Sequence, residues 1–434
     1  MRTFTILWAG QMVSTIGTTM TQFALTIWAW QLTEAATAIA LITFFFQLPQ
    51  ILMAIFAGLI VDRFNRKYLM MFSDISIAIS TLLIWWLYNS NHLEIWHLYG
   101  LAIAYGCFGQ IQKLAYNASI SLIIPKQHYT RASSMSSLVN YSAVIIAPAL
   151  VGMLYPAIGI GGIIAIDLAT FLVGIITLAI IQIPQPIYMD SQNLINNTIW
   201  QEMTWGTNYI LCKPSLRTMT ICFCLFLFTY HLGETLLEPM ILARTNGNPQ
   251  ILGTVVTAAG VGGVIGALSL SFWGDVKQKI RAMLLGFIGA GLGGIVFGLG
   301  QTPLIWISAQ FFFSCYIPLS FSSSYAVWYA KVEPEIQGRV LAAAHTFGLI
   351  FGTIASLIAG PLADRVFTPM MNSQGWLQSV FMPFVGAESG AGIALLYIFA
   401  SIGMILVGAG SYAFPTLLNA ENLLPDHQNQ FNLD

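Results

Sequence analysis

Long apolar runs that carry almost no charge decide what this chain can fold into. Residues 38–61 and 163–183 are continuously apolar over the roughly 20 residues that a helix needs to cross a bilayer. Strands of a membrane barrel would instead alternate polar and apolar side chains over about ten residues. Only 8% of the 434 residues are charged, against about 25% in an average soluble domain. The sequence therefore predicts an all-α integral membrane protein that crosses the bilayer many times.

The apolar pattern predicts twelve transmembrane helices in two halves of six. A polar connection separates the halves, and an amphipathic segment within it predicts a helix on the membrane surface. The expected units are an N-terminal half at 1–183, the connection at 184–215, a C-terminal half at 216–415 and a tail at 416–434. The predicted spans are 4–31, 38–61, 68–89, 96–124, 133–155, 163–183, 216–243, 251–273, 282–301, 305–330, 341–363 and 390–414.

The distribution of Lys and Arg predicts the orientation, because connections on the cytoplasmic side are enriched in these residues. With the N-terminus inside, only Arg244 and Arg365 fall outside, and Lys113 lies within a span. The other cations all fall inside, which predicts that both termini are cytoplasmic. They are Arg2, Arg63, Arg66, Lys67, Lys126, Arg131, Lys213, Arg217, Lys277, Lys279, Arg281, Lys331 and Arg339.

Charge and cysteine content exclude two other classes of protein. The net charge of −1 and the pI near 6.6 leave no basic surface for nucleic acid. Five cysteines are too few for a secreted disulfide scaffold, and they lie mostly in apolar runs. The expected partners are membrane lipid, a small-molecule substrate and protons.

The two predicted halves repeat each other weakly. Asp62 after the second span matches Asp275 after the eighth, 213 residues later. Ala147 and Pro148 in the fifth span match Gly360 and Pro361 in the eleventh at the same offset. Parallel repeats of this kind are typical of transporters that rock their halves about a binding site near the middle of the membrane.

A motif between the second and third spans carries a family resemblance. Residues 58–67 read Gly58, Leu59, Ile60, Val61, Asp62, Arg63, Phe64, Asn65, Arg66 and Lys67. This run resembles the Gly-x-Leu-Ala-Asp-Arg-x-Gly-Arg-Arg signature of the major facilitator superfamily, with Asn65 in place of the usual glycine. Asp275 and the basic residues after it resemble a decayed second copy. The resemblance implies two pseudo-symmetric six-helix halves and transport by alternating access.

In that family the signature acts as a conformational latch. The resemblance assigns the latch to residues in the two motif copies and to arginines that precede the fifth and eleventh spans. They are Gly58, Asp62, Arg63, Arg66, Lys67, Asp275, Arg131 and Arg339. A carboxylate at a helix end can pair with arginine or with the N-terminus of another helix. The alternative interpretation is that these cations only set the topology.

Shorter similarities point to one branch of the family. Residues 124–132, 332–340, 375–392 and 419–426 resemble enterobactin-type siderophore exporters, macrolide efflux pumps and exporters of nonribosomal-peptide gene clusters. The resemblance implies a monomeric exporter in the bacterial plasma (inner) membrane. The Gly-Pro motif that drug antiporters carry in the fifth helix here reads Ala147-Pro148, so the proline kink is kept and the first glycine is lost.

Charged residues within spans are costly and are candidates for function. His231, Glu234 and Glu238 follow the spacing i, i+3, i+7, which places them on one face of the seventh helix. Carboxylates beside an imidazole can bind and release protons, so we predict that Glu234 carries the coupling proton with the help of His231. Glu238 and Asp74 are further candidates. The alternative is that Glu238 is solvated or paired near the membrane surface, and that Asp74 is a packing group.

Polar residues on several spans predict a substrate pocket. Lys113 either contacts an acidic substrate or forms an ion pair with Asp74. A wide cavity with polar and aromatic walls suits a bulky, partly apolar solute. The candidate substrate-binding residues are Lys113, Gln110, Gln11, Gln22, Gln47, Asn140, Tyr141, Tyr325 and Trp328. The alternative for each neutral residue is a hydrogen bond between helices.

These observations together predict a secondary active exporter, driven by proton antiport, of a peptide-like or siderophore-like natural product or a drug. The alternatives are a lipid flippase, an uncoupled facilitator or importer of an amphiphilic solute, and a receptor that does not transport. No phosphate-binding loop, nucleophile–base pair, metal site or cofactor motif emerges, so we expect neither an enzyme nor an ATP-driven pump.

Overall fold

The computed structural model describes residues 2–125, 128–183, 199–274, 278–373, 375–386 and 388–418. Within these ranges it consists of helices and connections, with no strand. The first part of the chain forms α1 (Arg2–Thr33), α2 (Ala36–Arg63), α3 (Arg66–Asn89), α4 (Ile95–Ile123) and α5 (Tyr129–Ile180). The second part forms α6 (Ile199–Cys212), α7 (Pro214–Arg244), α8 (Pro249–Trp273), α9 (Lys279–Leu299), α10 (Pro303–Lys331), α11 (Pro334–Leu362), the π-helical turn η2 (Ala363–Phe367), α12 (Thr368–Asn372), α13 (Trp376–Val385), α14 (Ala391–Gly410), the 3-10 turn η3 (Ser411–Ala413) and α15 (Pro415–Leu418).

A helix covers every predicted span, which confirms the all-α membrane fold. The predicted fifth and sixth spans both lie in α5, which is broken at Gly159, where φ is +62°. Glycine adopts this left-handed conformation without steric cost, and Pro156 just before it disfavours a continuous helix. Within the described ranges, nine stretches are long and apolar enough to cross a membrane. That number counts α5 once and leaves out α1 and α4, so apolarity alone supports the count of twelve only in part.

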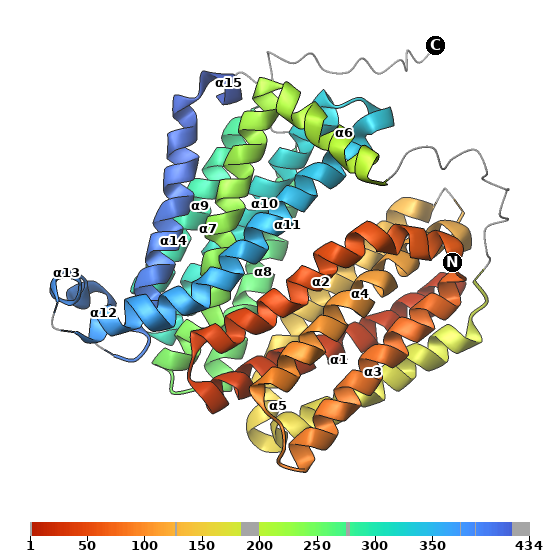
Figure 1. Ribbon diagram of the computed structural model, residues 1–434, viewed down its shortest axis with the longest axis horizontal. Coiled ribbons are helices and arrows are strands. Elements are labelled where there is room, and N and C mark those ends of the chain that lie inside the picture. Colours follow the sequence, from red (N-terminus) through yellow and green to blue (C-terminus); the bar gives the residue numbers. More distant parts are fainter. Residues whose placement is uncertain are drawn as a thin grey trace.

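The helices form two bundles that meet along two seams (Figure 1). In the first bundle α1 packs along α5, and α4 packs against α2 and α3. In the second, α7 packs against α11 and α14, and α9 packs against α10 and α14. One seam between the bundles joins α2 to α11, and the other joins α5 to α8.

Glycines allow the close approach at both seams. A Cβ added to Gly253 of α8 would lie 2.5 Å from the Pro148 carbonyl oxygen of α5. A Cβ added to Gly360 of α11 would lie 2.5 Å from Cα of Thr37 on α2. Small residues of this kind let transmembrane helices pack backbone to backbone.

The predicted amphipathic segment forms α6, which packs against α11 and α7. Gly206 lies against the Arg339 backbone at the start of α11, while Trp205 and Leu211 are exposed. We refer below to the end of the molecule that carries α6 and the start of α1 as the α6 end. The opposite end, which carries α12 and α13, is the α13 end (Figure 1).

Candidate functional site

The two halves are held together at the α13 end by a carboxylate. Asp364, in η2 after α11, accepts three hydrogen bonds from the N-terminus of α2 in the other half. Its Oδ1 accepts from the Ala36 amide at 3.1 Å, and its Oδ2 accepts from the Thr37 amide at 2.7 Å and the Thr37 hydroxyl at 2.6 Å. The first amides of a helix have no partner within that helix and carry partial positive charge. Asp364 therefore caps α2 from the opposite half, and we call this group of bonds the Asp364 clamp.

Further from the clamp the seams weaken toward the α6 end. In the middle of the α2–α11 seam, the Thr353 hydroxyl donates to the Gln47 side chain at 3.2 Å. In the α5–α8 seam, the Thr257 hydroxyl donates to the Ile145 carbonyl at 3.2 Å. Closer to the α6 end, side chains on the same helices become exposed, among them Leu52 of α2 at 52% and Leu138 of α5 at 53%. The two bundles are thus joined at the α13 end, and their helices diverge toward the α6 end (Figure 1).

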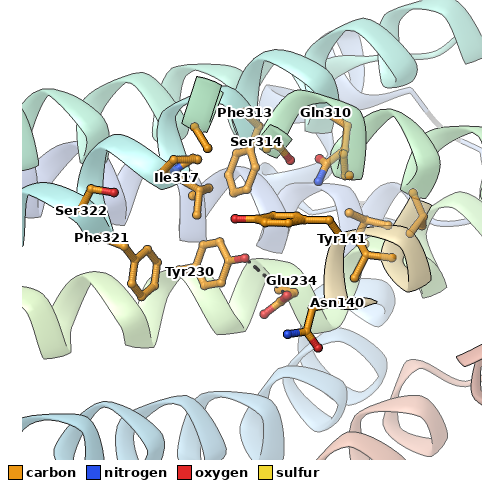
Figure 2. Close-up of a pocket in the computed structure, with 18 of the residues that line it drawn as sticks. Asn140, Tyr141, Tyr230, Glu234, Gln310, Phe313, Ser314, Ile317, Phe321 and Ser322 are labelled. Carbon is orange, nitrogen blue, oxygen red and sulfur yellow. Dashed lines mark hydrogen bonds between the residues drawn. The ribbon is translucent and has the colours of Figure 1, made fainter. Parts of the chain in front are cut away.

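A cavity of about 680 Å³ lies between the halves behind the closed end. Helix α5 lines it from the first half, and α7, α8, α10 and α14 line it from the second. Figure 2 shows the Tyr141 ring projecting from α5 into the space between α7 and α10. The walls also include the aromatic side chains of Tyr230, Phe313, Phe321, Tyr325 and Tyr397, and the polar side chains of Asn140, Glu234, Glu238, Gln310, Ser314 and Ser322.

Helix α7 brings together the predicted stripe of His231, Glu234 and Glu238. His231 Nδ1 lies 2.8 Å from Glu234 Oε2, and the Tyr230 hydroxyl donates to Glu234 Oε1 at 3.4 Å (Figure 2). The Glu234 side chain is 52% exposed and faces the cavity, whereas His231 is only 24% exposed. His231 packs against Gly352 of α11, where an added Cβ would lie 2.6 Å from the imidazole ring. The imidazole is therefore held in place behind a carboxylate that solutes and water can reach.

Glu238 marks the point where the central cavity meets a second one. It lines both the central cavity and a cavity of about 290 Å³ formed mainly by α1, α2 and α4. Thr26 of α1 lines this second cavity together with Glu238. Glu238 thus lies where residues of both halves meet, one turn beyond Glu234.

A third, smaller cavity of about 140 Å³ lies within the second half, toward the α6 end. It shares Phe321 and Tyr325 with the central cavity and is also lined by His231, Trp328 and His345. The three cavities therefore follow one another, from the first half through the centre to the α6 end of the second half.

The predicted substrate residues divide into several groups. Asn140, Tyr141 and Tyr325 line the central cavity, Gln22 lines the second cavity and Trp328 lines the third. Gln47 instead bonds to Thr353 across the seam. Gln110 is half-buried on α4.

Gln11 belongs to a polar cluster inside the first half. Its side-chain oxygen accepts a hydrogen bond from Gln112 of α4 at 2.5 Å. Asp74 is only 6% exposed. This environment fits the packing interpretation of Asp74 better than a proton site open to the cavity.

Lys113 is exposed and forms no ion pair with Asp74 in the described part of the chain. His345, near the start of α11 in the other half, is exposed as well. The predicted Lys113–Asp74 pair is therefore absent.

The signature residues that the structure describes bind within the first half. The Arg66 guanidinium donates to the Ala118 carbonyl at 2.6 Å, and Lys67 Nζ donates to the Ala179 and Ile181 carbonyls at 2.7 Å each. Cations at the C-termini of helices are stabilised by the carbonyls left without a helical partner. Asn65 caps α3 by accepting from the amide of Lys67 at 3.0 Å.

The remaining latch candidates are placed less completely. The backbones of Gly58, Asp62 and Arg63 lie in α2, but their side chains lie outside the described part of the chain, as does all of Asp275. Arg131 and Arg339 are exposed at the α6 end of α5 and α11. No group of three His, Cys, Asp or Glu side chains that could hold a metal occurs among the described residues.

Two residues at these sites were missed by the sequence reasoning. The first is Asp364, although Gly360, Asp364 and Arg365 repeat the pattern of Gly58, Asp62 and Arg63 at an offset of 302 residues. The second is Gln310, whose side chain is 5% exposed and whose Oε1 has no hydrogen-bond partner. Nothing in its sequence context distinguishes it from other polar residues in α10.

Comparison with known proteins identifies relatives that transport. Macrolide efflux protein A of Streptococcus pyogenes is 23% identical over 84% of this chain and 90% of the relative. The multidrug efflux pump Tap of Mycolicibacterium fortuitum is also 23% identical, over 73% of this chain and 78% of the relative.

Solved structures show the same fold. The nucleoside transporter NupG superposes with a TM-score of 0.70 at 12% identity, covering 95% of this chain and all of that one. The inward-open xylose transporter XylE of E. coli superposes with a TM-score of 0.63 at 14% identity, covering 96% and 99%. The family model described as Major Facilitator Superfamily matches residues 7–356. The chain belongs to the major facilitator superfamily of membrane transporters.

Proposed function

We propose that this transporter is a secondary active exporter that exchanges protons for an amphiphilic natural product or drug. Two bacterial relatives with efflux names, each matching most of the chain, support the direction of transport. A cavity of about 680 Å³ is within the range of sites that enclose drug-sized ligands, and its walls are mostly apolar and aromatic. This cavity suits a bulky, partly apolar solute.

The observation that carries the proposal is the His231–Glu234 pair, 2.8 Å apart, at the wall of a cavity between the halves. A carboxylate in contact with both an imidazole and the transport pathway can take up and release a proton as access alternates. The pair lies near the middle of α7, so a proton carried there crosses part of the membrane field. One charge moved through the whole potential gains about 2.3 kcal/mol per 100 mV.

The orientation follows from the Lys and Arg distribution, which assigns the α6 end and both termini to the cytoplasm of a bacterial inner membrane. The conformation closed by the Asp364 clamp is then the inward-facing one. A solute enters from the cytoplasm, the α6 end closes, and the clamp opens to release the solute outside. Signature residues Asp62, Arg63, Arg66 and Lys67 are proposed to stabilise the closed α6 end in the other conformation.

Transport into everted membrane vesicles tests the proposal. Vesicles that contain the wild-type protein should accumulate a macrolide when a pH gradient, acidic inside, is imposed, and should lose it when the gradient collapses. Glu234→Gln should abolish this gradient-driven accumulation without lowering the amount of protein in the membrane. Glu388→Gln removes an exposed carboxylate outside the cavities and is the matched control. Normal accumulation by Glu234→Gln would exclude Glu234 as the proton carrier, and accumulation without a gradient would favour an uncoupled facilitator or a flippase.

A further inference from the structure

The charge of the central cavity has one sign. Its lining includes two carboxylates, Glu234 and Glu238, and no Lys, Arg or His among the described residues that form it. His231 reaches Glu234 from behind, and Lys113 and His345 lie toward the α6 end. A solute in this cavity therefore meets two carboxyl groups and no basic side chain among the described lining residues.

Aromatic rings surround these carboxylates. Tyr230 and Phe313 stack with their ring centres 6.0 Å apart and their planes 13° from parallel. Tyr141 projects between these rings and Gln310 (Figure 2), and Phe321, Tyr325 and Tyr397 complete the wall. The face of an aromatic ring carries negative electrostatic potential and attracts cations, most strongly where water is excluded. Rings together with carboxylates form a site for a cation that has apolar substituents.

An unmet hydrogen-bonding group lies on the opposite wall. Gln310 of α10 lines the cavity, is 5% exposed, and has an amide oxygen with no partner. A buried acceptor without a partner is destabilising, and such groups are rare in folded proteins. A donor on a bound solute would satisfy it. This observation is independent of the charge of Glu234 and points to the same cavity.

We infer that the central cavity binds an amphiphilic organic cation: a protonated or quaternary amine lies against the aromatic rings with Glu234 as its counter-ion, and an N–H or O–H group of the solute donates to Gln310. The inference rests on the proposed export function and names the substrate class of its site. It narrows the range of solutes, because an anionic, siderophore-like compound would meet carboxylates in place of cations.

The same geometry makes the solute a competitor of His231. Glu234 Oε2 is bonded to His231 Nδ1, while Glu234 Oε1 faces Tyr230 and the cavity. A cation that approaches Glu234 therefore competes with the His231 imidazole for this carboxylate.

Binding of isosteric probes to purified protein in lipid nanodiscs tests the inference. Three dansyl derivatives with the same linker end in a trimethylammonium, a neutral tert-butyl or a sulfonate group. We expect the trimethylammonium probe to bind at least tenfold more tightly than the tert-butyl probe, and the sulfonate probe to bind most weakly. Glu234→Gln should remove the preference for the cation and change the affinity for the neutral probe less than twofold. Glu388→Gln should leave all three affinities unchanged.

A second variant tests the role of Gln310. For a trimethylammonium probe with a hydroxyl on its linker, Gln310→Leu should remove the extra affinity that the hydroxyl provides. It should leave the affinity for the probe without a hydroxyl unchanged.

Equal affinities of the wild type for cationic and neutral probes, or a preference for the sulfonate, would overturn the inference. This binding requires no gradient, so its result is separate from that of the proposed export. Cation selectivity without gradient-driven transport would refute only the coupling, and coupled transport without selectivity would refute only this inference.

Discussion

Removal of the Asp364 carboxylate should shift the equilibrium between the closed and open states of the α13 end. Asp364→Ala deletes three hydrogen bonds of 2.6–3.1 Å from Ala36 and Thr37, and with them the cap of α2. In the open state water replaces these bonds, so only their net contribution is lost. Loss of a helix cap costs about 0.5–2 kcal/mol, and the favourable interaction of a carboxylate with a helix N-terminus adds about 0.3–1 kcal/mol.

These contributions together give about 2 kcal/mol in favour of the closed state. Since each 1.4 kcal/mol is tenfold, the ratio of open to closed molecules should rise about 30-fold in Asp364→Ala. Asp364→Asn keeps one acceptor oxygen and should give an intermediate shift. The ratio of open to closed molecules changes only because Asp364 caps a helix of the other half. A cap formed within one helix would be present in both states and would leave this ratio unchanged.

The distance between spin labels on the two halves measures this shift. Labels at His92→Cys and Thr302→Cys lie on exposed connections at the α13 end, one in each half, in a background that lacks the five native cysteines. Asp364→Ala should add a population at longer distance. Glu34→Gln removes another exposed acid near the same end and should leave the distribution unchanged. A distribution in Asp364→Ala identical to that of the wild type would refute the clamp.

Three further changes test the same structure. Thr37→Val removes one of the three donors to Asp364. It should shift the free-energy difference between the closed and open states by about 1 kcal/mol toward the open state, as read from the same label distances. It should have no added effect in an Asp364→Ala background. Gly253→Val places a side chain where a Cβ lies 2.5 Å from the Pro148 carbonyl, and should widen the α5–α8 seam in a label pair across it; an unchanged seam would contradict the assigned packing. Lys67→Met removes two hydrogen bonds to carbonyls at the end of α5 and should lower the free energy of unfolding of the purified protein by about 1–2 kcal/mol. Arg281 is exposed, and Arg281→Met should leave the free energy of unfolding unchanged.

The fold was largely predictable because its determinants are local. Apolar runs of transmembrane length locate the helices, since backbone groups in a bilayer must bond within their own segment. The spacing of His231 and Glu234 places them on one helix face, and their contact follows from the geometry of a single helix. The sequence predicted a connection between two spans within α5. The chain reverses there at Gly159, so that Met135 and Thr177 both lie beside the start of α1.

The clamp and the cavity were less predictable because they depend on how the halves meet. Asp364 accepts hydrogen bonds from residues more than 300 positions away in the sequence. No local sequence pattern predicts that α2 begins beside it. For the same reason, the sequence could not decide whether Lys113 forms an ion pair with Asp74, and the structure shows no such pair. Gln310 stands out only in the folded structure, where its buried side-chain oxygen has no hydrogen-bond partner.

Proton movement across everted vesicles tests proton-coupled export through Glu234 most directly. A pH-sensitive dye reports the imposed gradient while a macrolide or the trimethylammonium probe is added to vesicles that contain the wild type, Glu234→Gln or Glu388→Gln. The wild type and Glu388→Gln should dissipate the gradient in proportion to added solute, and Glu234→Gln should not. A wild-type protein that binds the solute and leaves the gradient intact, or a Glu234→Gln variant that still dissipates it, would contradict the account.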